Sequence, residues 1–236
     1  MVFLFLTNFH KKPPELSRQP IQWKNHLVEL LVVILGITIA FTIDKLVEQR
    51  KENREMQVAM EAIMDDLRRD IRVFNSSQIP NNQERVDQLN YIIDELKKEN
   101  IQNDSLPRLV QGVFGSMNSR VTNATYESLK SAGKLEDIPN VNVRRRIISF
   151  YQSNYPQSDY LSNTNTAFSK QIADYASSVS DVFFTGNFGD PKLLNDLVFR
   201  SMLARWRNTI AFKVSEYKRL AKESQSLLDL MEKELN

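Results

Sequence analysis

The chain has 236 residues, of which 42% are hydrophobic, and its 31 lysines and arginines nearly balance its 29 aspartates and glutamates. It contains no cysteine and two histidines, His10 and His26, which excludes disulfides, cysteine metal sites, thiol catalysis and a histidine zinc site after residue 26. Glycine (6) and proline (8) are scarce, so we predict an all-α fold.

The small positive excess lies entirely before residue 44. Residues 1–43 contain four basic and two acidic side chains, so the rest of the chain is electrically balanced. A balanced domain gives no electrostatic reason to bind nucleic acid, and we expect no nucleic-acid partner.

Residues 1–26 are predicted to form a cytoplasmic or interfacial N-terminal tail. The apolar residues 1–10 lack the basic start and the small-residue cleavage site of a signal peptide. An alternative is an interfacial anchor formed by Phe3, Phe5 and Phe9.

Residues 27–47, LVELLVVILGITIAFTIDKLV, form an apolar run of membrane-spanning length. A bilayer requires about 20 residues of helix, so the span has to include its charged flanks, with Glu29, Asp44 and Lys45 near the interfaces. Apolar residues occupy every face of this helix, which favours a transmembrane helix over a buried amphipathic helix.

Small residues within the span predict helix association. Gly36 and Ala40 are four residues apart, and Thr38 and Thr42 can bond across to a second helix or back to their own backbone. Ordinary transmembrane composition is the alternative. Glu29 is an ionisable group about one turn inside the span, and the simpler explanation is that its carboxylate reaches the headgroups.

The charge next to the span does not decide its orientation, because each flank has four lysines and arginines. We predict a cytoplasmic N-terminus, since long domains are translocated largely irrespective of charge.

The helix is predicted to continue outward through residues 48–74, and residues 75–236 to form the rest of an antiparallel bundle of four or five helices. Residues 75–82, NSSQIPNN, and 185–191, TGNFGDP, are predicted turns or loops. Helical spacing of apolar residues predicts helices over residues 83–99, 106–114, 122–130, 142–183 with a break or kink at Pro156, and 192–235.

Two charge clusters have competing interpretations. Asp65, Asp66 and Asp70, which alternate with arginines, are typical of a solvated ion-pair network, although carboxylates can also hold a divalent cation. Arg144, Arg145 and Arg146 are expected to form surface or inter-helix salt bridges, with phosphate or carboxylate binding as the alternative.

Aromatic residues at helical spacing are expected to belong to the core, although they could also line a ligand pocket between helices. The residues concerned are Tyr151, Tyr155, Tyr160, Tyr175 and Trp206. Together with the three arginines, we consider Tyr151, Tyr155 and Trp206 as possible partner or ligand contacts.

The segments ELLVVILGITIAFTIDKLVEQRKENREMQVAMEAIMDDLRRDI and TNATYESLKSAGKLEDIPNVNVRRRIISFYQ together resemble an uncharacterised family of single-span, membrane-anchored helical proteins of Bacteroidota. The likeness covers residues 27–155 and includes the pair Phe150-Tyr151. It departs where the family often has an Asn-Trp-like pair and this chain has Asp44-Lys45-Leu46. The resemblance implies an envelope protein and supplies no active site.

These patterns predict a non-enzymatic structural or interaction protein anchored in the bacterial inner membrane. Its N-terminus would be cytoplasmic, and its periplasmic bundle would meet a protein partner or an envelope complex. A homo-oligomer or a subunit of a membrane complex is expected, with the lipid bilayer as a partner and no cofactor. The alternative is a sensor-type bundle that binds a small solute.

Overall fold

The computed structural model describes residues 23–98, 103–115 and 118–235. The structure is 86% helical and contains no strand within those ranges, which confirms the all-α prediction. The chain divides into two compact units, residues 1–53 and 54–236. Residues 1–22 of the predicted tail lie outside the described residues.

The long helix α1 covers Trp23–Val73. In the first unit, the side chains of residues 27–47 are exposed all around the helix. In the second unit, one stripe of the same helix is buried, with Met56, Met60, Ile63 and Leu67 each at most 8% exposed. The change from an apolar surface on every face to a single buried stripe therefore lies within one helix.

The predicted turn at residues 75–82 is wrong. The structure places a π-helical turn, η1 (Phe74–Gln78), between α1 and α2 (Ile79–Glu95), so the helical backbone continues. Pro80 lies in the first turn of α2, directly after the π-turn, and proline is tolerated in the first turn of a helix. The Ile79 N–H donates to the Phe74 carbonyl, the bond that defines a π-turn.

Two short helices follow close to their predicted positions, α3 (Leu106–Gly112) and α4 (Ala124–Ser131). A 3₁₀ turn, η2 (Lys134–Asp137), comes after them. Asn123 is the N-cap residue of α4, and Gly133 has a φ of 70°, the left-handed conformation that glycine commonly adopts after the end of a helix.

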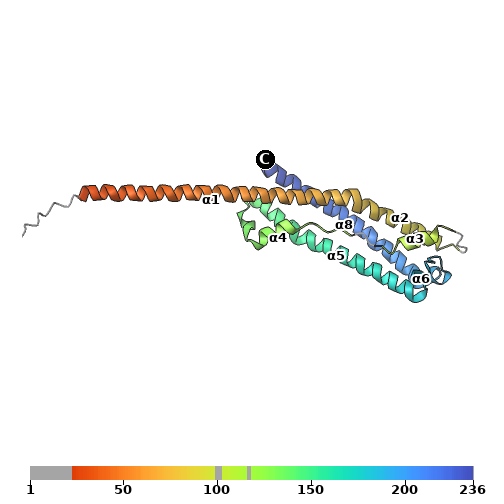
Figure 1. Cartoon of the computed structure of the whole chain (residues 1–236). Helices are drawn as coiled ribbons and strands as arrows, with labels where there is room; N and C mark the ends of the chain where they lie inside the picture. Colours follow the sequence, from red (N-terminus) through yellow and green to blue (C-terminus); the bar gives the residue numbers. More distant parts are fainter. Residues whose placement is uncertain (1–22, 99–102, 116–117, 236) are drawn as a thin grey trace, which may run out of the picture. The chain divides into compact units, whose positions relative to one another are not determined.

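Two helices of 39 residues complete the bundle, α5 (Val141–Val179) and α8 (Leu197–Leu235). The Asn140 side chain caps α5, and Pro156 lies inside α5 without interrupting it. The connection contains α6 (Val182–Thr185) and α7 (Pro191–Leu194), so the last helix begins five residues later than predicted. α8 packs against both α2 and α5 (Figure 1).

The second unit contains two apolar core clusters. The α1 core combines α1 and α4 with the first part of α5 and the last part of α8, and the α2 core combines α2, α3 and α7 with the other parts of α5 and α8. Along α5 the first cluster ends at Leu161 and the second begins at Phe168, and along α8 they are separated between Ile210 and Tyr217. Polar side chains occupy the level between the two clusters.

Candidate functional site: a polar layer between two cores

The polar layer is formed by α2, α5, α8 and the extended segment 118–120. Asn165 and Lys213 are each 1% exposed and Ser162 is 3% exposed, so polar groups take positions that apolar side chains occupy elsewhere in these helices. Buried polar groups are costly unless they are hydrogen-bonded, and a layer of them in an apolar bundle is a candidate functional site.

Asn118 is the centre of the network. Its Oδ1 accepts hydrogen bonds from Asn165 Nδ2 at 2.8 Å and from Lys213 Nζ at 2.9 Å, and its Nδ2 donates to Thr166 Oγ1 at 2.8 Å. Thr166 Oγ1 in turn donates to the Ser162 carbonyl at 2.9 Å. Because Asn118 Oδ1 has two donors, the orientations of both amides are fixed by the network.

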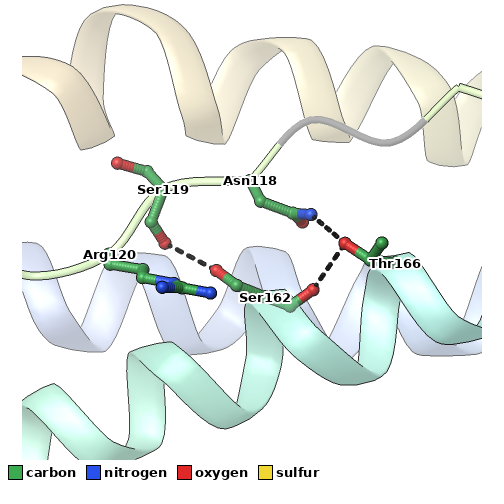
Figure 2. A pocket seen from close by; sticks show the side chains of 5 residues that line it. All are labelled: Asn118, Ser119, Arg120, Ser162 and Thr166. Atoms are coloured by element: carbon green, nitrogen blue, oxygen red, sulfur yellow. Dashed lines mark hydrogen bonds between the residues drawn. The ribbon is translucent and has the colours of Figure 1, made fainter.

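The 118–120 segment is held against both α5 and α8. The Tyr217 hydroxyl accepts from Ser119 N at 3.0 Å and donates to Ser119 O at 3.1 Å. The Ser162 hydroxyl donates to the same carbonyl at 3.2 Å, as Figure 2 shows. These side chains supply the partners that extended backbone inside a helical bundle requires.

The layer carries more positive than negative charge. Burial, together with the smaller effect of the nearby Arg85 guanidinium, lowers the pKa of Lys213 to about 7. Burial also lowers the pKa of Arg85, whose guanidinium donates to the Gly115 carbonyl. Arg120 is paired with Asp159 at 3.0 Å.

Two recesses open beside the network. The Asn118 recess is about 490 Å³ and is lined by Asn118, Ser119, Arg120, Ser162 and Thr166 (Figure 2). The Lys213 recess is about 330 Å³, and Asn165, Arg205 and Lys213 are among its lining residues. Both volumes are in the range of small-molecule sites in proteins.

A second polar cluster lies where α4 begins. Asp70 of α1 accepts from Thr122 N at 2.8 Å and from Thr122 Oγ1 at 2.7 Å, and Asp66 accepts from Thr125 Oγ1 at 2.6 Å. Both aspartates are buried, so the prediction of a solvated face is wrong for this pair. Burial raises the pKa of Asp70 to about 6, and the Asp66 charge adds to this effect, while the bonds from Thr122 oppose it.

The outer part of the same charge cluster is an ion-pair network, as predicted. Arg68 contacts Glu61, Asp65 and, on α8, Glu232, at 2.8–3.0 Å. Within residues 23–98, 103–115 and 118–235, no group of three or more histidine or acidic side chains is arranged to hold a metal ion.

Two of the three predicted arginines form ion pairs inside the second unit. Arg144 contacts Glu136 at 3.2 Å, and Arg146 joins α5 to Glu223 of α8. Arg145 is exposed. As partner or ligand contacts, the three arginines stay predictions.

The structure distributes the predicted aromatic residues among separate places. Tyr151 stacks on Tyr126 at 4.6 Å in the α1 core, whereas Trp206 is fully buried in the α2 core and donates to the Val113 carbonyl at 3.1 Å. Tyr155 is half-buried, and Tyr160 lines the Lys213 recess. Their role as partner or ligand contacts stays a prediction.

Sequence reasoning missed the residues of the polar layer, of which Lys213 and Asn118 show two different reasons. Lys213 follows Ile210 by three residues and precedes Tyr217 by four, so it occupies a position on the apolar stripe of the last helix. A lysine at a position where the helix is otherwise apolar is the feature of the sequence that could have indicated a buried polar site. Asn118 lies outside any helix and carried no periodic signal.

In the first unit, the predicted association residues lie on exposed helix. The Thr38 hydroxyl donates to the Ile34 carbonyl at 2.8 Å and the Thr42 hydroxyl to the Thr38 carbonyl at 2.7 Å, so both bond back to their own backbone. A Cβ added to Gly36 would meet no described atom within 4 Å. Among the described residues, one helix is long and apolar enough to cross a membrane.

The sequence profile of a family of unknown function, DUF6090, matches residues 29–200. The chain belongs to the DUF6090 family. The predicted resemblance to an uncharacterised family is confirmed at this level, and the match extends beyond the two segments that suggested it. No curated protein and no solved structure matches this DUF6090 chain.

Proposed function

We propose that this DUF6090 protein is a non-enzymatic membrane anchor whose second unit binds a protein partner or joins an envelope complex. The observation that supports the anchor is the exposure of residues 27–47 on every face of α1. An apolar helix of this length without a protein cover in the described chain requires an apolar solvent, and a lipid bilayer provides one.

We further propose that the membrane is a bacterial inner membrane of the Bacteroidota type, with residues 1–26 cytoplasmic and the second unit periplasmic. The motifs quoted from the sequence support this location. Gly36 and Ala40 on the exposed helix support self-association within the membrane.

Exposed apolar side chains support the protein partner. In and beside α6 and at the start of α8, Phe184 is 93% exposed, Leu197 75% and Val198 52%. Leu197 and Val198 are adjacent in sequence, and neighbouring exposed apolar side chains are typical of protein contact surfaces.

The anchor is tested by replacing two residues in the middle of the apolar run. In the double variant Leu35→Asp, Ile39→Asp, each charge costs about 2.5–3.5 kcal/mol of membrane insertion, so we expect the protein to move from the carbonate-washed membrane pellet to the supernatant. The unchanged chain should stay in the pellet.

Val58→Asp is the matched control, because Val58 is 65% exposed on the same helix but belongs to the second unit. This variant should stay in the pellet. Extraction of the unchanged chain by carbonate would contradict the anchor, and protease digestion of the second unit from the cytoplasmic side would contradict the orientation.

A further inference from the structure

The Lys213 recess has the features of a ligand site. This site is independent of the proposed membrane anchor and of the proposed protein partner. It lies between α5 and α8, and two of its lining residues, Asn165 and Lys213, are each 1% exposed. Both side chains are held in position by hydrogen bonds, because Asn165 Nδ2 and Lys213 Nζ each donate to Asn118 Oδ1. A pocket whose polar groups are already held in place suits binding better than a mobile surface.

The charges at this recess favour an anion. Lys213 and Arg205 both line it, and none of the described residues that line it is acidic. Arg205 forms no ion pair with any described residue, and its guanidinium lies 4.9 Å from the centre of the Phe168 ring. A carboxylate between an arginine and a lysine would receive charge-assisted hydrogen bonds.

The Asn165 carbonyl oxygen provides a second point of recognition. Among the described residues, Asn165 Oδ1 is buried and has no hydrogen-bond donor. Its amide cannot turn round without breaking the bond from Nδ2 to Asn118, which is 2.8 Å long. A ligand N–H that donates to this buried acceptor would remove the cost of leaving it without a hydrogen bond. The adjacent cations favour a neutral donor over an ammonium group.

Aromatic and aliphatic side chains form the outer wall of the recess. Tyr160 is 61% exposed and Phe212 53% exposed, and both line the recess together with Leu161. Exposed rings next to a cationic pocket offer an apolar surface to the part of a ligand that lies away from its charge. A volume of about 330 Å³ limits the ligand to a small molecule.

We propose that the Lys213 recess binds a small organic carboxylate that carries an apolar group and a neutral N–H donor, as an N-acylated amino acid does. The carboxylate contacts Lys213 and Arg205, the N–H donates to Asn165 Oδ1, and the apolar group lies on Tyr160 and Phe212. This is the solute-binding alternative left open by the sequence, and it does not depend on the proposed membrane function.

N-acetyl-L-phenylalanine is the test probe, titrated by ligand-observed NMR into the full chain in lipid nanodiscs, with empty nanodiscs subtracted. We expect binding with a dissociation constant of about 0.5 mM. N-acetyl-L-phenylalaninamide, which lacks the negative charge, and inorganic phosphate, which lacks the apolar group, should each bind at least about tenfold more weakly. Hydrocinnamate, which lacks the N–H, should bind with intermediate affinity.

Arg205→Ala and Lys213→Met should each weaken binding of the probe about tenfold or more. Lys218→Ala, an exposed cation on the same helix outside the recess, is the matched control and should bind like the unchanged chain. Circular dichroism verifies that the variants are folded, and because Arg205 is exposed, its variant keeps the test valid if Lys213→Met unfolds.

Three comparisons could overturn the proposal. They are equal binding of the amide and the carboxylate, equal binding of phosphate and the probe, and unchanged binding in Arg205→Ala. The absence of binding to the unchanged chain would also overturn it, while carbonate extraction of the same chain separately decides the anchor.

Discussion

Asp70 is a buried residue in which desolvation and hydrogen bonding act in opposite directions. Its carboxylate accepts hydrogen bonds from the Thr122 N–H and from the Thr122 hydroxyl, which favour the ionised form. Burial has the larger effect and raises the pKa of Asp70 from 3.8 to about 6. A carboxyl group whose pKa is higher in the folded state binds more protons there than in the unfolded chain. Its contribution to stability is therefore complete below pH 3.8 and is lost as the pH rises through 6.

Asp70→Asn should remove this pH dependence, because asparagine cannot ionise, keeps an acceptor oxygen for the Thr122 N–H and can donate to the Thr122 hydroxyl oxygen. The free energy of unfolding of the unchanged chain relative to the variant should fall by about 2 kcal/mol between pH 4 and pH 7. Thermal unfolding in detergent at a series of pH values, followed by circular dichroism, measures the difference.

Asp65→Asn is the control, because Asp65 is exposed and pairs with Arg68 on the outer face of α1. It should change the pH profile little between pH 4 and pH 7. Parallel profiles for Asp70→Asn and the unchanged chain would show that Asp70 does not titrate in this range.

Lys213 shows the opposite dependence. Burial and Arg85 lower its pKa to about 7, so its contribution to stability is present above its ordinary pKa of 10.5 and is lost as the pH falls through 7. Near neutral pH the charge of Asp70 and the charge of Lys213 both oppose folding. Charged groups that oppose folding and are held by hydrogen bonds are typical of functional sites rather than of packing.

At the scale of the element, α1 permits a direct test of association in the membrane. A Cβ added at Gly36 meets no described atom within 4 Å apart from its own stretch of helix, so we attribute an effect of Gly36→Leu on self-association to contact with a second helix. We expect the signal of a membrane self-association reporter that carries residues 23–53 to fall severalfold. Ile37→Leu is the control and should leave the signal unchanged, whereas an unchanged signal in Gly36→Leu would exclude Gly36 from the contact.

The sequence predicted the long helices better than their junctions. The stripes that include Ile63, Leu67, Ile147 and Tyr217 are buried as expected, because apolar periodicity reports directly which face of a helix is covered. The failure at residues 75–82 has a local cause: asparagine, serine and proline favour turns, but they are also accepted in the first turn of a helix and in a π-turn. Tertiary packing decided between the two, since Phe74 and Gln78 are buried.

The polar layer shows why a candidate site is harder to predict than a helix. Arg85, Asn118, Asn165 and Lys213 come from four segments, and only folding brings them to one level between the two cores. Lys213 and Asn165 each break a local apolar pattern, since Asn165 lies four residues after Leu161 and three before Phe168. Asp66 and Asp70 were recognised as a charged cluster, but their burial depends on α4 packing over them.

At the scale of the whole molecule, the two units imply that the second unit folds without the first. The described apolar core begins at Met56, and both core clusters lie within residues 54–236. A fragment of residues 54–236 should therefore be soluble without detergent, should unfold cooperatively, and should show the emission of a buried tryptophan from Trp206.

A fragment of residues 65–236 lacks the buried Met56, Met60, Ile63 and Met64 and should melt at a lower temperature, since removing one such side chain costs about 2–5 kcal/mol. Aggregation or non-cooperative melting of the longer fragment would mean that the first unit contributes to folding, whereas equal melting of the two fragments would mean that the α1 stripe contributes no core.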